Sequence, residues 1–153
     1  MTPSERREEI LRALSGSSLP ADSCFIVSDA ASLIISFGPD VMDELESIVL
    51  SHVEGDSGSL LLEGELAIAY LVLTGVHAPQ RGVDFLRARS ERVQELVLKV
   101  AKAVFGPWEN GRPLSFSIPL GAEFREFVRS RQSSSSAEVS RFAAWLWTLW
   151  NPA

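Results

Sequence analysis

The stretch Ser57-Gly-Ser-Leu-Leu-Leu-Glu-Gly-Glu-Leu-Ala-Ile-Ala-Tyr-Leu-Val-Leu-Thr-Gly75 is the most apolar run in the chain and lies near its middle. With about 100° of rotation per residue, its apolar side chains would cover nearly the whole circumference of an α-helix. Such a helix is typical of positions enclosed by other helices, because no side of it is suited to water. We therefore interpret the rest of the chain as segments that cover this central helix.

Glu65 is the one candidate buried acid of the central helix, and its environment depends on where that helix begins. If the helix begins at Ser57, Glu65 projects among apolar side chains. Burial favours the neutral form of a carboxylic acid, which is what a general acid needs. If the helix begins at Glu63, a start that Gly64 favours, both carboxylates lie in the first turn and are solvated. The solvated alternative is the preferred one.

Helical patterns account for most of the remaining chain. Predicted helices span residues 3–14, 28–37, 39–53, 79–105, 120–131 and 137–150. The first has a clear start signal, because Thr2 can cap it, Pro3 suits the first helical position and Glu5 follows three residues after the cap. A break is expected near Gly82. Short strands remain an alternative only within residues 24–37 and 114–118, where β-branched and aromatic residues occur.

Length and composition point to one ordinary globular domain. The chain has 153 residues, of which 46% are hydrophobic and 22% are charged. These values and the helical patterns predict a single all-α domain, residues 1–153, with about seven helices in antiparallel hairpins. Signal-peptide and membrane-spanning patterns are absent from the sequence, so we expect a cytoplasmic location and no membrane partner.

One part of the chain resembles a known repeat. Pro39-Asp-Val-Met-Asp-Glu-Leu-Glu-Ser-Ile-Val49, followed by Glu65-Leu-Ala-Ile-Ala-Tyr-Leu-Val-Leu-Thr-Gly75, resembles one HEAT-type helical hairpin. The resemblance covers residues 39–75 and extends at most to residue 105. It lacks the Val-Arg pair often expected early in the second helix of such hairpins. It implies a HEAT-like or irregular helical bundle that serves as a scaffold or binding protein rather than as a catalyst.

The charges are distributed unevenly along the chain. Residues 13–80 hold ten acidic side chains and no Lys or Arg, whereas residues 81–153 hold eleven basic and seven acidic side chains. Phosphate binding needs Lys and Arg, so we expect no nucleic acid at the first half. A protein partner with a basic surface fits it instead. The candidate carboxylates are Asp40, Asp43, Glu44, Glu46, Glu54 and Asp56. A merely solvated helix face is the alternative.

Tryptophans supply a second set of candidate contact residues. Trp108 begins a long irregular connection, where it either covers the core or contacts a partner. Trp145 and Trp147 lie on opposite borders of the last predicted helix. Tryptophan is enriched at binding hot spots, so this helix is a candidate for partner binding or for homo-oligomer formation. The alternative is that the same residues dock the helix onto the core.

The sequence shows little sign of catalytic or metal chemistry. A single cysteine, Cys24, and two histidines, His52 and His77, fall in no metal-binding spacing. Glycine-rich phosphate loops and nucleophile elbows are also absent from the sequence. We therefore expect no cofactor, no metal and no enzymatic activity.

These features favour a small protein-interaction module, either an adaptor or an acidic inhibitor such as an immunity protein or an antitoxin. It would present the carboxylates of residues 40–56 to a cationic surface, with electrostatics increasing the association rate. The alternative is a small helical enzyme or ligand-binding protein with an interhelical pocket formed by Glu65, Tyr70 and an arginine.

Overall fold

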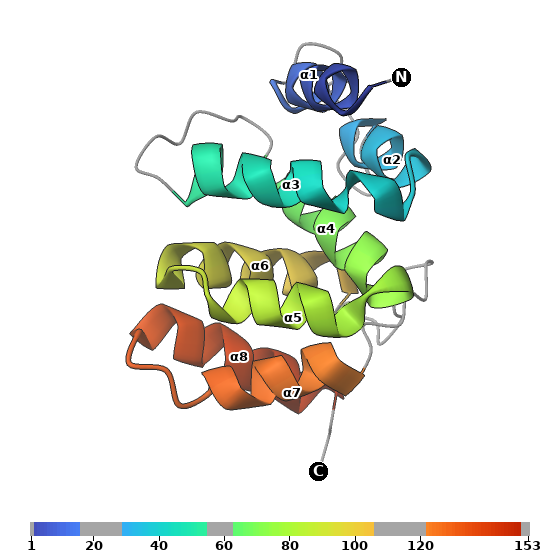
Figure 1. The fold of residues 1–153 in the computed structure, drawn as a ribbon. Coiled ribbons are helices and arrows are strands. Elements are labelled where there is room, and N and C mark those ends of the chain that lie inside the picture. Colours follow the sequence, from blue (N-terminus) through green and yellow to red (C-terminus); the bar gives the residue numbers. More distant parts are fainter. Residues whose placement is uncertain (1, 16–28, 55–62, 106–121, 151–153) are drawn as a thin grey trace. The chain divides into compact units, whose positions relative to one another are not determined.

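A computed structural model describes residues 2–15, 29–54, 63–105 and 122–150, and all the regular structure in these ranges is helical (Figure 1). The prediction of an all-α fold is confirmed. The α-helices are α1 (Pro3–Leu14), α2 (Asp29–Ser36), α3 (Met42–Ile48), α4 (Glu63–His77), α5 (Pro79–Arg87), α6 (Glu91–Phe105), α7 (Ala122–Arg131) and α8 (Ala137–Trp150). A 3₁₀ turn at Pro39–Val41 precedes α3 and a π-helical turn at Val49–Val53 follows it. We call this continuous stretch, residues 39–53, the α3 segment.

The predicted helix over residues 79–105 is two helices, and the break near Gly82 was placed wrongly. Gly82 is buried inside α5, where its N–H donates to the carbonyl of Ala78 at 3.1 Å. The chain breaks at residues 88–90 instead. Ser90 begins α6, because its hydroxyl accepts from the N–H of Val93 at 3.4 Å and its carbonyl accepts from the N–H of Gln94. A serine cap therefore outweighs an isolated glycine as a boundary signal.

Helix α4 is the central apolar helix, and as described it begins at Glu63. It runs on to His77, so the predicted end at Gly75 was wrong by two residues. Pro79 opens α5 directly afterwards. The buried side chains of α4 leave no polar side over two turns, as the apolar pattern predicts; they are Leu66, Ala67, Ala69, Tyr70, Leu71, Val72, Leu73 and Thr74.

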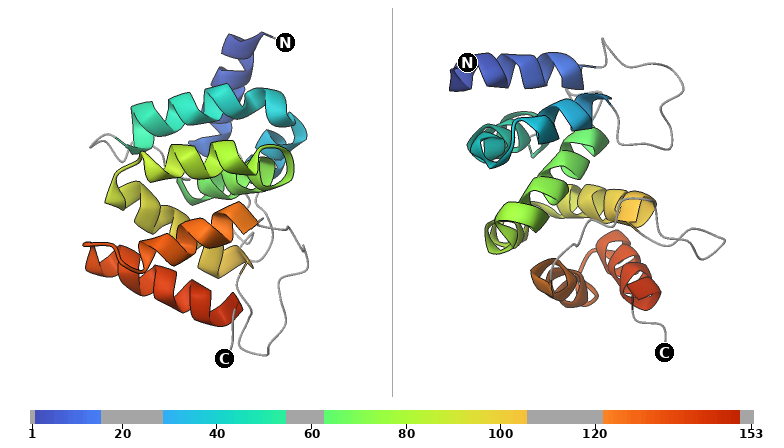
Figure 2. Two further views of the ribbon diagram at one scale, coloured as in Figure 1. Left: turned by 60° about the horizontal axis from the view of Figure 1, so that its bottom comes forward. Right: turned by 90° about the vertical axis from the view of Figure 1, so that its right-hand side faces the viewer.

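The described helices cluster into two compact units, Met1–Thr74 and Gly75–Ala153, where the sequence predicts one domain. In the first unit, α1 packs against α2 and α3 (Figure 2). The fully buried side chains of this unit come from these three helices, from the turns that flank α3 and from α4, whose residues up to Thr74 belong to the unit; they include Ile10, Leu14, Ile34, Val41, Met42, Leu45, Ile48, Val53, Leu66 and Ala69.

The second unit consists of two stacked helical hairpins, α5–α6 and α7–α8. Helix α5 lies beside α7 and α6 lies beside α8, so the unit has two layers of helices (Figures 1 and 2). Its largest fully buried side chain is Phe127, whose ring lies 5.7 Å from that of the buried Phe124. The aliphatic part of the core includes Val83, Leu86, Val93, Leu98, Val128, Val139 and Leu146. Among the described helices, none combines the length and the apolar character needed to cross a membrane.

Candidate functional site

The α3 segment positions the predicted acidic residues. Gly38 precedes it with a φ of 78°, a conformation that glycine adopts without strain and that turns the chain from α2 into the segment. Pro39 then fixes the first turn. Asp40 lies in the 3₁₀ turn and Asp43 in the first turn of α3, where the partial positive charge of a helix start favours acidic side chains.

Helical periodicity divides the predicted partner-binding carboxylates among different environments. Asp40 and Asp43 are exposed, and Glu46 and Glu54 are half-buried. Glu44 is only 9% exposed, because it lies on the side of the segment that faces α1. The structure therefore does not bring these residues together as one exposed acidic face. It leaves a narrower surface, which we call the acidic stripe: Asp40, Asp43, Ser47 and Leu50, all exposed and spaced three or four residues apart.

Glu44 forms an ion pair with α1 at the border of this stripe. Its Oε1 lies 3.2 Å from Nη2 of Arg6, and the two side chains are 10% and 20% exposed. The pair is incompletely satisfied, since Glu44 Oε2 and Arg6 Nε are buried without a hydrogen-bond partner. A buried acceptor or donor without a partner costs about 1–3 kcal/mol. The contact between α1 and α3 is therefore polar, charged and imperfect.

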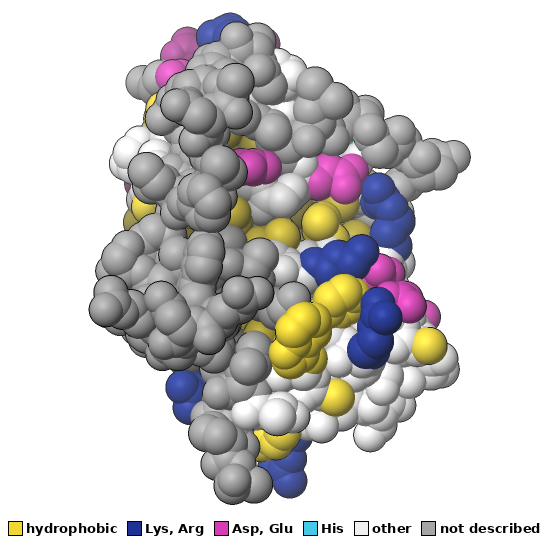
Figure 3. Space-filling view, turned by 180° about the vertical axis from the view of Figure 1, so that it is seen from behind, with side chains coloured by type: hydrophobic (Ala, Val, Ile, Leu, Met, Phe, Trp, Pro, Cys, Tyr) yellow, Lys and Arg dark blue, Asp and Glu magenta, His cyan; other side chains and the backbone are white. Residues whose placement is uncertain are grey.

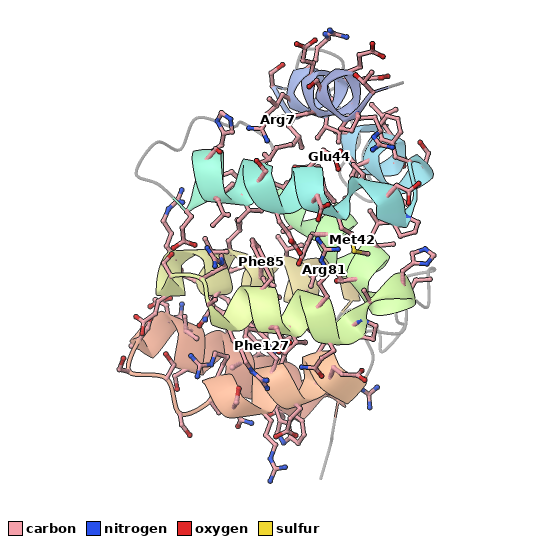
Figure 4. The ribbon with its side chains drawn as sticks, viewed as in Figure 1. Arg7, Met42, Glu44, Arg81, Phe85 and Phe127 are labelled. Atoms are coloured by element: carbon pink, nitrogen blue, oxygen red, sulfur yellow. The ribbon has the colours of Figure 1, made fainter. Side chains whose placement is uncertain are left out.

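Arg7 adds a second contact from α1. Its Nη1 donates to the hydroxyl of Ser47 at 2.7 Å. In Figure 4, Arg7 of α1 and Glu44 of α3 project toward each other's helix. We call the four residues Arg6, Arg7, Glu44 and Ser47 the α1–α3 contact. The sequence analysis did not predict that arginines of α1 contact the α3 segment. The sequence feature that could have indicated this contact is the pair Arg6 and Arg7, which lies one turn before Ile10 on an amphipathic helix.

At the other border of the acidic stripe, Tyr70 of α4 contacts Glu46. Its hydroxyl donates to Glu46 Oε2 at 2.7 Å, and the tyrosine itself is 3% exposed. Glu65 lies in the first turn of α4 and is half-buried. The Tyr70 hydroxyl is thus bonded to a carboxylate of α3 and not to Glu65. The alternative of an interhelical pocket formed by Glu65, Tyr70 and an arginine stays a prediction.

The tryptophans of α8 differ in exposure. Trp145 is 45% exposed, whereas Trp147 is half-buried. One turn before Trp145, the ring of Phe142 has the cations of Lys99 and Arg141 at 5.6 and 5.1 Å from its centroid. Figure 3 shows basic and hydrophobic side chains side by side on this face of the second unit. Each cation also pairs with a carboxylate of its own helix, so this surface is close to neutral.

Gln94 is a buried polar residue that sequence reasoning did not single out. It is 2% exposed, and its Nε2 donates to the carbonyls of Leu86 at 3.1 Å and Arg89 at 3.3 Å. Its Oε1 accepts from Arg131 Nη1 at 3.3 Å. We call these interactions the Gln94 contact. It ties the turn between α5 and α6 to the end of α7, which is a structural role.

Several predicted residues and chemistries remain without a structural counterpart. Asp56, Trp108, Cys24 and residues 114–118 lie outside the described ranges. In the ranges that are described, no group of three or more His, Cys, Asp or Glu side chains is placed to hold a metal ion. Comparison of the chain with protein-family models, with curated proteins and with solved structures finds no match.

Proposed function

We propose that this protein is a protein-interaction module, an adaptor or an acidic inhibitor, that binds a basic partner through the acidic stripe of α3. The observation that carries the proposal is the joint exposure of Asp40, Asp43 and Leu50 on one side of the α3 segment. The carboxylates would steer and orient a cationic surface, and Leu50, 48% exposed, would supply an apolar contact that binding buries.

Two further observations support the proposal. The Arg6–Glu44 pair at the border of the stripe demonstrates that the α3 segment accommodates a guanidinium group. The stacked hairpins α5–α6 and α7–α8 have the layered plan of helical scaffold proteins, whose role is to present binding surfaces. This plan agrees with the role that the HEAT-type resemblance of residues 39–75 implies.

Affinity capture tests this function. The chain would be used to capture proteins from an extract of its own cells at low and high salt, and the captured protein would then be identified. We expect one basic protein, lost at high salt and lost from the variant Asp40→Lys/Asp43→Lys. The matched control, Asp84→Lys/Glu126→Lys, makes the same charge change at two exposed acids of the second unit and should leave capture intact. Capture that ignores the first variant would contradict the proposal.

Trp145 supports a second candidate function, homodimer formation through α8. It is 45% exposed, and the neighbouring exposed residues Ala144 and Thr148 are small enough for a second helix to approach closely. Light scattering over a range of protein concentrations would detect a dimer. Trp145→Gln should then shift the protein to monomer, while Leu50→Gln, a similarly exposed residue of the first unit, should not. A monomer at all concentrations would rule this function out.

A further inference from the structure

We infer that α1 is a built-in occupant of the binding surface of α3, and that the partner this surface fits is an amphipathic helix with arginine one turn ahead of an Ile/Leu stripe. Such a partner would bind by displacing α1. The inference rests on the proposed function, because it names the class of basic partner that the acidic side of α3 would take.

The first step is that α1 already has the arrangement of a helical ligand. Arg6 and Arg7 contact α3, and Ile10 and Leu14 follow at one-turn intervals with no exposed surface. The opposite side of α1 carries exposed charged residues such as Glu5 and Glu8. Amphipathic helices that bind in grooves use the same spacing of anchors along one face. The α1–α3 contact is therefore a direct template for the partner.

The second step is that α1 fills this surface imperfectly. Glu44 is 9% exposed, yet it receives a single hydrogen bond from Arg6, and its Oε2 has no partner. The Nε of Arg6 is buried beside it and also has no partner. A guanidinium in the bidentate arrangement would bond both carboxylate oxygens at once. A partner arginine with that geometry would gain hydrogen bonds that α1 does not make.

The third step is that few side chains hold α1 in place. Its buried residues are Ile10, Ala13 and Leu14. A helix of 12 residues is only marginally stable alone, so α1 depends on its contacts with α2 and α3. If α1 covers the binding surface in most molecules, a competing helix can bind only the fraction in which the surface is open. Its apparent affinity is then the intrinsic affinity multiplied by that fraction. Weakening the docking of α1 should therefore strengthen the binding of a competing helix.

The test uses the full chain and a fluorescent peptide with the sequence of residues 2–15. Binding is measured by anisotropy, and displacement of α1 by hydrogen exchange of its amides. Leu14→Ala loosens α1 without touching Glu44, and it should raise the affinity for the peptide by roughly tenfold or more. Arg6→Gln, a milder change, should raise it in the same direction. Added peptide should also speed exchange within α1.

Two controls identify the contact. A peptide with glutamine in place of Arg6 and Arg7 should bind at least about tenfold more weakly, because it lacks the charged hydrogen bonds to Glu44 and Ser47. Adding Glu44→Gln to the Leu14→Ala chain should likewise weaken binding of the original peptide. If α1 cannot leave α3 without unfolding the rest of the first unit, neither loosened variant gains affinity, so equal or weaker binding there would overturn the inference.

A third probe separates this inference from the proposed function. Oligolysine forms no amphipathic helix with an apolar stripe, so it tests the exposed carboxylates alone. If oligolysine binds and Asp40→Asn/Asp43→Asn abolishes that binding, while the α1 peptide does not bind the loosened variants, then the inference fails and the acidic function stands. If neither probe binds, both fail.

Discussion

The described part of each unit contains a largely buried polar contact between helices, and the polar atoms of the two contacts find hydrogen-bond partners to different degrees. In the Gln94 contact, a neutral amide uses both its N–H groups and its oxygen, and only Arg131 Nε is left without a partner. In the α1–α3 contact, a charged pair makes one hydrogen bond and leaves a buried N–H and a buried carboxylate oxygen unsatisfied. One contact is nearly complete, and the other is not.

From this difference we interpret the Gln94 contact as structural and the α1–α3 contact as one that a partner could replace. Burying an ion pair requires the removal of water from two charges, and the attraction offsets that cost only when every polar atom is paired. A buried amide with its hydrogen bonds made has a smaller cost. The Gln94 contact therefore fixes the junction of α5, α6 and α7, whereas the α1–α3 contact leaves hydrogen-bonding capacity that a partner could use.

The largest expected effect contrasts one fully buried apolar side chain in each unit. Phe127→Ala removes the largest fully buried side chain of the second unit and should lower the free energy of unfolding by about 3–5 kcal/mol. Leu14→Ala removes an equally buried side chain, but its effect should be confined to α1. Hydrogen exchange distinguishes these outcomes. Protection should fall throughout α5–α8 in the first variant and within α1 alone in the second.

If Leu14→Ala lost hydrogen-exchange protection throughout the first unit, the expected contrast with Phe127→Ala would be contradicted. It would mean that α1 unfolds only together with the rest of the first unit. The replaceable character of α1 would then have to be abandoned, whatever the hydrogen-bond geometry of its arginines.

The next effect tests the nearly complete contact. Gln94→Leu leaves the carbonyls of Leu86 and Arg89 without their buried donor and should cost about 2–3 kcal/mol in urea unfolding. The matched control is Gln80→Leu, because the Gln80 side chain is exposed and bonds Asp84 at the surface. The control should change stability by less than about 0.5 kcal/mol. Equal effects would show that the Gln94 contact contributes nothing beyond an ordinary surface glutamine.

Much of the fold could be predicted because its signals are local. Thr2 and Glu5 form the expected reciprocal cap of α1, with the Glu5 N–H donating to Thr2 Oγ1 and the Thr2 N–H to Glu5 Oε2. The bounds of α8 agree with the predicted 137–150. The break between α5 and α6 was predicted at the wrong place because glycine is the more familiar signal for a helix boundary. The cap that begins α6 consists of only two hydrogen bonds, which Ser90 accepts from the N–H groups of Val93 and Gln94.

The candidate site was harder to predict, because its decisive contacts are remote in sequence. With 3.6 residues per turn, Glu44 lies beside the side of the α3 segment that carries the buried residues Val41, Leu45 and Ile48. Nothing local indicated its partner, since Arg6 lies 38 residues away in the chain. Counting acidic residues along the chain therefore overestimated the exposed acidic surface. Only the packing of α1 shows which carboxylates remain in water.

A smaller effect is expected within the incomplete contact itself. Glu44→Gln keeps the size of the side chain but removes the charge opposite Arg6, and it should cost about 1 kcal/mol because both groups retain some exposure. Replacing the pair with apolar residues, Arg6→Met/Glu44→Leu, should bring stability back to within about 1 kcal/mol of the original protein. Urea unfolding measures both. A double variant less stable than the single one would show that the pair is better satisfied than its geometry indicates.

The smallest expected effect concerns an exposed ion pair, and it tests whether burial makes the Arg6–Glu44 pair contribute more to the free energy of unfolding. Glu95 and Lys99 on α6 form an ion pair at 2.9 Å with the i, i+4 spacing, but their side chains are 28% and 52% exposed. Glu95→Gln should therefore cost only about 0.3–0.5 kcal/mol, and about 1 M salt should remove that cost by screening. The cost of Glu44→Gln should persist in the same salt, because its partner is largely shielded from water. If salt erased both effects alike, the α1–α3 contact would behave as a surface pair, and its unsatisfied atoms would be reached by water.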